Sequence, residues 1–273
     1  MSDTPRIIFS HANGFPAGTY HTVFDSLRAR GFAVEAIEKF GHDPAYPVTD
    51  NWPHLVQQLA DFAQAHIDRW GTPAFLTGHS LGGILSLMCA ALHPQLARGV
   101  VLLDSTVVLG WRANALALAK RTSLTKDVMP HRATRKRRNQ WASWQEAFEH
   151  FRSRKVFAHW DEQVLRDYIE HGTVASDGST GARALAFERE IEAKIYDTVP
   201  HNLNALLRAH PVQCKVAFIG ARKSAELRLA GPDAIRHVSK GRLMMLDGSH
   251  LFPMEKPLAT AAAMEAALRN LMG

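Results

Sequence analysis

The stretch Gly78-His79-Ser80-Leu81-Gly82-Gly83 lies between an apolar run, Ala74 to Thr77, and a helical run, Ile84 to Leu92. A serine with a glycine two residues away on each side, in this context, predicts a sharp turn from a strand into a helix. Only small neighbours let the chain turn so tightly. The turn raises the Ser80 hydroxyl out of the sheet, and the N-terminus of the following helix favours developing negative charge. The pattern therefore predicts that Ser80 is a nucleophile.

Short apolar runs alternate with amphipathic segments on both sides of this turn, which predicts βαβ units and a mostly parallel sheet. Apolar residues at helical spacing predict helices over Thr19 to Arg30, Trp52 to Trp70 and Leu258 to Leu271. The predicted strands are Arg6 to Ser10, Ala33 to Ile37, Ala74 to Thr77, Gly99 to Leu103, Lys215 to Ile219 and Gly241 to Leu246.

The strand pattern is interrupted from about Leu109 to Asn202, where the sequence is rich in tryptophan and arginine and its aromatic residues are spaced like buried helix faces. A turn is expected inside this stretch at Ser176 to Gly181. The sequence thus predicts an α/β core made of residues 1–108 and 203–273, with a helical region inserted at residues 109–202.

Charge and composition narrow the functional classes. Lysine and arginine number 32 against 26 acidic residues, a modest excess that would favour anionic partners only if it were clustered. One cluster, Arg132 to Arg138, is followed by Trp141 and Trp144 and could form a nucleic-acid patch. Such runs are more often solvated helix faces, so we expect no nucleic-acid partner.

The two cysteines, Cys89 and Cys214, lie in apolar stretches, where a free thiol acts as a small hydrophobic group. A single bridge between them stays open, but no CxxC metal motif or disulfide framework is present. No secretory signal is recognisable at Met1 to Arg6, and no stretch has the ~18 apolar residues of a membrane span. We therefore expect a cytoplasmic protein with no metal and no membrane partner.

A serine hydroxyl needs a neighbouring proton acceptor to attack at neutral pH, and one of the fifteen histidines stands out. His250 follows the predicted strand Gly241 to Leu246 directly, on the loop Asp247-Gly248-Ser249-His250. The carboxyl ends of parallel strands form the edge where ligands bind. Alone, a loop histidine would more often be a surface residue; combined with the serine turn, His250 is predicted to accept the proton.

Over nearly its whole length the chain resembles the α/β-hydrolase family, in the order of nucleophile, acid and histidine and in a helical cap inserted before the last strands. The resemblance implies that Ser80 is the nucleophile, that His250 is the general base and acid, and that the inserted region covers the site. No cofactor is implied. A serine at this turn argues against the epoxide hydrolase and haloalkane dehalogenase branches.

The segment Phe9 to Pro16 resembles the family's His-Gly loop, which supplies an oxyanion donor. Here Ala12 stands where glycine is usual. We assign the oxyanion hole to the backbone N–H groups of Leu81 and Asn13, with that of Ala12 as the alternative. His11 is expected to pin the loop and to take no direct part in catalysis.

The family most often places its acid after the strand that precedes the histidine, but no aspartate occurs in Gly220 to Glu226. Two carboxylates compete, Asp104 at the end of an earlier strand and Glu226 at the start of a helix. We favour Asp104, because a strand-end carboxylate is held rigidly at the active edge. Asp247 is too close to His250 along the loop to orient it.

The predicted reaction is hydrolysis of a carboxylic ester or thioester through an acyl-enzyme, with a small molecule as the partner. The alternatives are a C–C bond hydrolase, a cofactor-free perhydrolase, or a binding protein that keeps the fold without turnover. The aromatic insertion suggests an apolar pocket, while the run Arg135 to Arg138 could attract an acidic substrate or a coenzyme A thioester. The sequence does not predict the oligomeric state.

Overall fold

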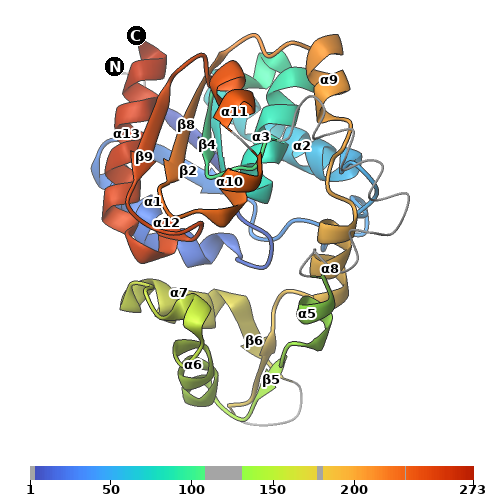
Figure 1. The fold of residues 1–273 in the computed structure, drawn as a ribbon, viewed down its shortest axis with the longest axis vertical. Helices are drawn as coiled ribbons and strands as arrows, with labels where there is room; N and C mark the ends of the chain where they lie inside the picture. Colours follow the sequence, from blue (N-terminus) through green and yellow to red (C-terminus); the bar gives the residue numbers. More distant parts are fainter. Residues whose placement is uncertain (1–3, 108–130, 177–180, 231) are drawn as a thin grey trace.

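The computed structural model describes residues 4–107, 131–176, 181–230 and 232–273. Its centre is a six-stranded sheet in the order β2-β1-β3-β4-β8-β9, in which every pair of neighbours is parallel (Figure 1). This confirms the predicted α/β class and every predicted strand. The strands are β1 (Arg6–Ser10), β2 (Ala33–Ala36), β3 (Ala74–His79), β4 (Ala97–Leu103), β8 (Lys215–Ala221) and β9 (Leu243–Leu246).

Alternate residues of these strands face opposite sides of the sheet and enter two separate cores. Ile7 and Phe9 of β1 join one core, and Ile8 between them joins the other. The first core is covered by α1 (His21–Ala29) and α13 (Pro257–Met272), and the second by α2 (Pro53–Trp70), α3 (Leu81–Leu92), α9 (Leu203–Ala209) and α11 (Pro232–Ser239). The sheet is thus buried on both faces, as parallel sheets are.

The inserted region, by which we mean the described part of residues 109–202, lies beyond the carboxyl edge of the sheet (Figure 1). Its predicted helical character is confirmed. Its expected start at Leu109 and most of the expected turn at Ser176 to Gly181 lie outside the described residues. The helices are α5 (His131–Lys136), α6 (Trp144–Arg152), α7 (Glu162–Gly172) and α8 (Arg189–Asp197), with a 3₁₀ turn, η4 (Lys155–Phe157), between α6 and α7.

The same region also contains a small antiparallel sheet that the sequence pattern did not predict. Its order is β5-β7-β6, from β5 (Gln140–Trp141), β6 (Thr173–Ala175) and β7 (Arg183–Leu185). Strands of two or three residues are too short to produce an alternating hydrophobic pattern, so periodicity could not reveal them.

Aromatic side chains attach the inserted region to the core. Phe15, on the loop after β1, lies 5.6 Å from the Trp160 ring and 5.7 Å from the Tyr168 ring, between ring centroids. Phe151 and Phe157 extend the same cluster around Tyr168. Offset and edge-on aromatic contacts of this kind stabilise packing beyond the area they bury. The inserted region therefore rests directly on the loop predicted to carry an oxyanion donor.

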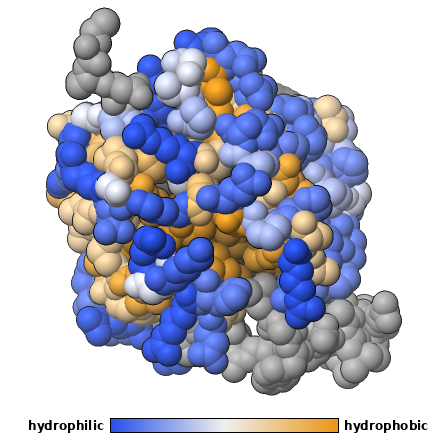
Figure 2. All heavy atoms as spheres, turned by 90° about the horizontal axis from the view of Figure 1, so that it is seen from above, coloured by the Kyte–Doolittle hydropathy of each residue, from blue (hydrophilic) through white to orange (hydrophobic). Residues whose placement is uncertain are grey.

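The opposite end of the molecule, seen from above, is hydrophilic around its rim, and apolar side chains gather near its centre (Figure 2). Among the described helices, none is both long enough and apolar enough to cross a membrane. The inserted region lies at the other end of the sheet, where the strands finish (Figure 1).

Candidate active site

Ser80 sits at the turn between β3 and α3 with a left-handed backbone, φ 53° and ψ −115°. A non-glycine residue is strained in this conformation, and the packing of its neighbours shows why the turn needs glycine. A Cβ on Gly82 would lie 2.0 Å from the carbonyl oxygen of Ser10, and a Cβ on Gly78 would lie 2.3 Å from the backbone of Gly82. The glycines thus let β1, β3 and α3 approach closely enough to form the turn.

Three side chains that are far apart in the sequence meet at this turn. The Oγ of Ser80 lies 3.0 Å from Nε2 of His250, and Nδ1 of the same ring lies 2.7 Å from Oδ2 of Asp104. A carboxylate can only accept, so Nδ1 carries a hydrogen and Nε2 of the neutral ring is left to accept from the serine hydroxyl. The predicted residues Ser80, His250 and Asp104 are therefore brought together in a hydrogen-bonded row.

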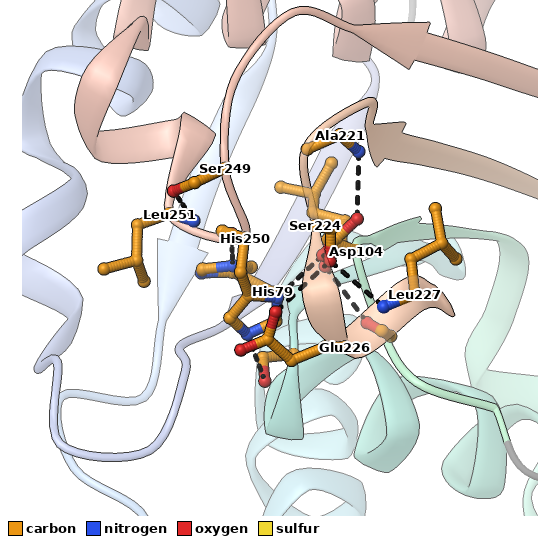
Figure 3. Close-up of polar contacts among 12 residues, drawn as sticks. His79, Asp104, Ala221, Ser224, Glu226, Leu227, Ser249, His250 and Leu251 are labelled. Atoms are coloured by element: carbon orange, nitrogen blue, oxygen red, sulfur yellow. Dashed lines mark hydrogen bonds and ion pairs between the residues drawn. The ribbon is translucent and has the colours of Figure 1, made fainter. Parts of the chain in front are cut away.

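Asp104 is held from three sides at the end of β4 (Figure 3). Its Oδ1 accepts the backbone N–H of Ala221 at 2.9 Å, and its Oδ2 accepts the hydroxyl of Ser224 at 2.5 Å in addition to His250. Burial raises the pKa of Asp104, but the hydrogen bonds and charge of His250, with those of Ser224 and Ala221, outweigh it and hold the pKa below its usual value. The group is thus a carboxylate suited to orient an imidazole.

Glu226, the competing acid, is close to the site but is not bonded to the imidazole. Carboxylate oxygens of Asp104 and Glu226 and a ring nitrogen of His250 lie within 4.8 Å of one another. Glu226 contacts Ser224 at 3.3 Å. Asp247 turns to Lys223 and Lys256 instead, each at 3.2 Å, so it does not orient the imidazole.

Two carboxylates and an imidazole are also ligand types that divalent cations accept. In this site, however, both oxygens of Asp104 already accept hydrogen bonds from protein groups, and His250 is bonded through both ring nitrogens. Protein hydrogen bonds thus already engage Asp104 and His250, and Nε2 of His250 faces the serine hydroxyl.

The loop after β1 brings a second set of polar groups to the serine. The N–H of Ala12 donates to the hydroxyl of Tyr20 at 3.1 Å, so that amide is already engaged within the protein. Asn13 and Ser80 line the same cavity. Leu81 is the first residue of α3, where the N–H has no helical carbonyl to bond.

His11 is fully buried, and its Nε2 accepts the N–H of Phe40 at 2.9 Å. Its Nδ1 then carries the hydrogen and donates to the carbonyl of Ala12 at 2.8 Å. Burial lowers the pKa of His11 to about 4, more than the bond to Ala12 raises it. The expectation that His11 pins the loop is confirmed.

The cavity beside Ser80 has a volume of about 570 Å³, within the range of small-molecule sites. Asn13, Ser80 and His250 form its reactive wall, while Phe15 and Val156 contribute apolar surface. Val156 comes from η4 of the inserted region. Core and insertion therefore share the cavity.

Two residues of the site escaped sequence analysis. Ser224 bonds the Asp104 carboxylate, and only its place in the segment where the family usually carries its acid could have pointed to it. His79, inside the glycine-flanked turn, donates to the backbone carbonyl of His250 at 2.8 Å. Serine and histidine are too common for position alone to have assigned either role.

The basic run is paired within the inserted region. Arg135 contacts Glu190 at 2.9 Å and Asp197 at 3.1 Å, and Arg137 and Arg138 each contact one glutamate, Glu192 and Glu146, at 2.5 Å. Acidic residues of the inserted region thus pair with Arg135, Arg137 and Arg138 of this run.

Solved structures of the same shape extend over nearly all of the chain. The E-2-(acetamidomethylene)succinate hydrolase superposes with a TM-score of 0.70 at 22% identity, covering 97% of this chain and 91% of that one. The thioesterase domain from the curacin biosynthetic pathway superposes with a TM-score of 0.73 at 15% identity, covering 97% and 92%. These likenesses establish the α/β-hydrolase fold and, at such identities, nothing finer.

Sequence comparison gives the family. Residues 3–173 match the sequence model of the serine aminopeptidase S33 family. Because this match covers more than half of the chain, the chain belongs to that family of α/β-hydrolases.

Curated relatives match over shorter stretches. Pheophytinase of Arabidopsis thaliana is 41% identical over 149 residues, 43% of this chain and 30% of its own. Monoglyceride lipase of Mus musculus is 27% identical over 136 residues, covering 48% and 45%. Pimeloyl-[acyl-carrier protein] methyl ester esterase of Chromobacterium violaceum is 29% identical over 108 residues, covering 39% of each chain. The matches thus span less than half of each relative.

Proposed function

We propose that the chain is a serine hydrolase that cleaves a carboxylic ester or thioester through an acyl-enzyme on Ser80. The observation that carries this proposal is the row of two hydrogen bonds, 3.0 Å from Ser80 to His250 and 2.7 Å from His250 to Asp104. Nucleophile, base and orienting acid within hydrogen-bond reach define serine-dependent acyl transfer. Relatives named as a lipase and as a methyl ester esterase support the substrate class.

The reaction proceeds in two balanced halves. Nε2 of His250 takes the hydroxyl proton as Oγ of Ser80 bonds to the carbonyl carbon, and the same proton passes to the leaving alcohol or thiol as its bond to carbon breaks. Water then attacks the acyl-enzyme while His250 takes one of its protons, and that proton returns to Ser80 as the acid leaves. Asp104 stays ionised and stabilises the imidazolium formed in each half.

The oxyanion of each tetrahedral intermediate is assigned to the backbone N–H groups of Leu81 and Asn13. Leu81 N–H is free of helical bonding, and the bond between Ala12 and Tyr20 favours Asn13 over Ala12 as the second donor. Each such donor contributes roughly 10²–10³-fold to the rate. The side chain of Asn13 supports this placement, because its Nδ2 donates to the carbonyl of Glu192 at 3.0 Å and so fixes the residue.

The inserted region, residues 109–202, is proposed to act as a cap that selects the substrate, with residues 1–108 and 203–273 as the catalytic core. Val156 on the inserted side of the cavity and Ser80 on the core side support this division of roles. The cavity volume and its apolar wall favour an ester of modest size over a long polymer.

Hydrolysis of p-nitrophenyl acetate and butyrate tests the proposal. We expect turnover by the wild type, a loss of at least ~10³-fold in kcat for Ser80→Ala, and fluorophosphonate labelling at the peptide that contains Ser80. Ser86→Ala is the matched control, because Ser86 lies farther along α3 and its hydroxyl donates to the carbonyl of Gly82. A wild type no faster than Ser80→Ala would favour a binding protein and reject the enzyme.

A further inference from the structure

His79, the residue before Ser80, has a fully buried imidazole that takes no part in the proton transfers proposed above. Its Nε2 lies 2.8 Å from the backbone carbonyl oxygen of His250 (Figure 3), and its Nδ1 lies 2.8 Å from the hydroxyl of Tyr20. That hydroxyl lies 3.1 Å from the backbone nitrogen of Ala12. A continuous row of buried hydrogen bonds thus joins the loop after β1 to the loop that carries His250.

The chemistry of the groups fixes the direction of every bond in this row. A carbonyl oxygen can only accept, so Nε2 of His79 carries the hydrogen. Burial, followed by the nearby charge of His250, lowers the pKa of His79 to about 3, so the ring is neutral at neutral pH and Nδ1 accepts from Tyr20. The Tyr20 oxygen in turn accepts the N–H of Ala12, because a backbone N–H only donates.

We propose that Tyr20 and His79, here called the Tyr20–His79 bridge, position both halves of the active site. One end holds the backbone of His250, so that its ring meets Ser80 and Asp104 together. The other end holds the amide of Ala12 away from the substrate, so that the amide of Asn13 faces the developing oxyanion. This inference rests on the proposed function of the chain as a serine hydrolase.

The surroundings of the bridge restrict movement of its members. Tyr20 is 1% exposed, and its ring packs against Phe9 and Phe24 at centroid distances of 4.7 and 6.2 Å. The His79 ring lies 6.4 Å from Phe252, which follows the histidine loop. Loss of one hydroxyl would leave two buried polar groups, Nδ1 of His79 and the N–H of Ala12, without partners. Removal of the hydroxyl would therefore weaken the link between the two site loops.

The first test deletes one oxygen atom. Tyr20→Phe keeps the packed ring and removes the hydroxyl, and we expect kcat for p-nitrophenyl butyrate to fall at least tenfold with KM changed less than threefold. The rate is expressed per site titrated with fluorophosphonate, so that unfolded molecules do not count. Tyr168→Phe makes the same deletion in an equally buried tyrosine of α7 and is expected to keep its kcat. A kcat for Tyr20→Phe within twofold of that of Tyr168→Phe would overturn the proposal.

The second test asks whether the donor to His250 matters more than the shape of the ring. In His79→Gln the side-chain amide can still donate to the His250 carbonyl, whereas in His79→Leu nothing can. We expect His79→Gln to recover at least ten times the kcat of His79→Leu at similar KM. Equal kcat values for the two variants, at equal folded fractions by circular dichroism, would show that His79 contributes only by packing. That result would contradict the proposed role of the Tyr20–His79 bridge.

The double variant Tyr20→Phe/His79→Leu distinguishes one connected unit from two separate ones. If the bridge acts as a unit, the double variant loses no more than about threefold beyond His79→Leu alone. A loss in kcat equal to the product of the two single-variant losses would contradict the proposal that the bridge acts as a unit. Failure of the proposed function looks different, because the wild type itself would then show no esterase activity and no labelling of Ser80.

Discussion

The loops at the carboxyl edge of the sheet and the inserted region meet at one cavity but are held in place by different forces. At the sheet edge, short hydrogen bonds fix Asp104 to Ala221 at the end of β8 and to Ser224 beyond it, and fix the backbone of His250 to His79 at the end of β3. The inserted region is attached to the core through tilted aromatic rings around Phe15 and through the bond from Asn13 Nδ2 to the Glu192 carbonyl, and it is held together internally by the largely buried ion pair of Arg137 with Glu192.

This difference indicates a division of tasks. Hydrogen bonds that are directional and buried define atom positions to within the tolerance that proton transfer needs. Aromatic contacts are less directional and tolerate changes of shape, which suits a surface that must accommodate substrate. Substitutions at the sheet edge should therefore act on kcat, and substitutions in the inserted region on stability and KM.

The largest expected effect lies at the sheet edge. Asp104→Asn should lower kcat by roughly 10³–10⁴-fold, because an amide has no negative charge to stabilise the imidazolium and its NH₂ group can hold the His250 ring in the wrong tautomer. Glu226→Gln should lower kcat less than fivefold, since Glu226 makes no hydrogen bond to that ring. Steady-state kinetics with p-nitrophenyl butyrate decide the ranking, and the reverse order would assign the orienting role to Glu226.

The next effect probes the internal stability of the inserted region. Arg137→Met should reduce the free energy of unfolding by about 2 kcal/mol, because Glu192, 6% exposed, loses its partner. Burial already raises the pKa of Glu192, ahead of the opposing effect of Arg137, so part of the cost is relieved by protonation. The measurement is urea unfolding followed by tryptophan fluorescence.

Arg138→Met is the matched control for Arg137→Met. Its partner Glu146 is exposed, and solvent screens such pairs, so little measurable change is expected. Equal losses for the two variants would show that burial of the partner does not determine how much these ion pairs stabilise the inserted region.

The sheet-edge half of the site was largely predictable from sequence. The glycine-flanked turn is easy to recognise in the sequence. Several close approaches, such as that of Gly82 to Ser10, leave no room for a side chain, so glycines stand at fixed spacings around Ser80. His250 and Asp104 each follow a strong apolar run directly, which locates them at the ends of strands. Parallel strands finish at a common edge, so their positions along the chain implied proximity in space.

The remaining features leave no comparable trace in the sequence. Ser224 and Tyr20 act through single hydroxyl groups in otherwise ordinary segments, and their partners Asp104 and His79 are 120 and 59 residues away. The strands of the inserted region are too short for a period, and the pairing of Arg137 with Glu192 depends on how two helices pack. Long-range packing decides these contacts, and local composition does not encode it.

The two regions also differ in how their stability depends on pH. Burial lowers the pKa of His11 to about 4 and that of His79 to about 3, so between about pH 6.5 and pH 4 the unfolded chain binds protons that the folded core does not. The free energy of unfolding should then fall as pH falls through this window, by about 1 kcal/mol per pH unit for each histidine. Glu192, with its raised pKa, acts in the opposite direction as pH falls.

Urea unfolding at half-unit steps from pH 7 to pH 4.5 measures how steeply the free energy of unfolding falls with pH. In His11→Gln it should fall less steeply, because one fewer histidine gains a proton on unfolding. A free energy of unfolding that stays constant over this range would show that the buried histidines of the core take up protons without opening the fold. It would weaken the contrast between a rigid sheet edge and an inserted region that tolerates changes of shape.

The smallest expected effect tests whether the inserted region selects substrate. Val156 is 59% exposed on η4 and lines the cavity, so Val156→Trp should narrow it and raise KM for p-nitrophenyl octanoate about threefold, a change of ~0.7 kcal/mol. The kcat and KM for p-nitrophenyl acetate should not change, because a short acyl group does not reach η4. Val174→Trp is the matched control, since Val174 is 48% exposed in the same region but away from the cavity. A change in kcat for the acetate ester would mean that η4 influences the reactive groups themselves, and the separation between core chemistry and inserted selection would not hold.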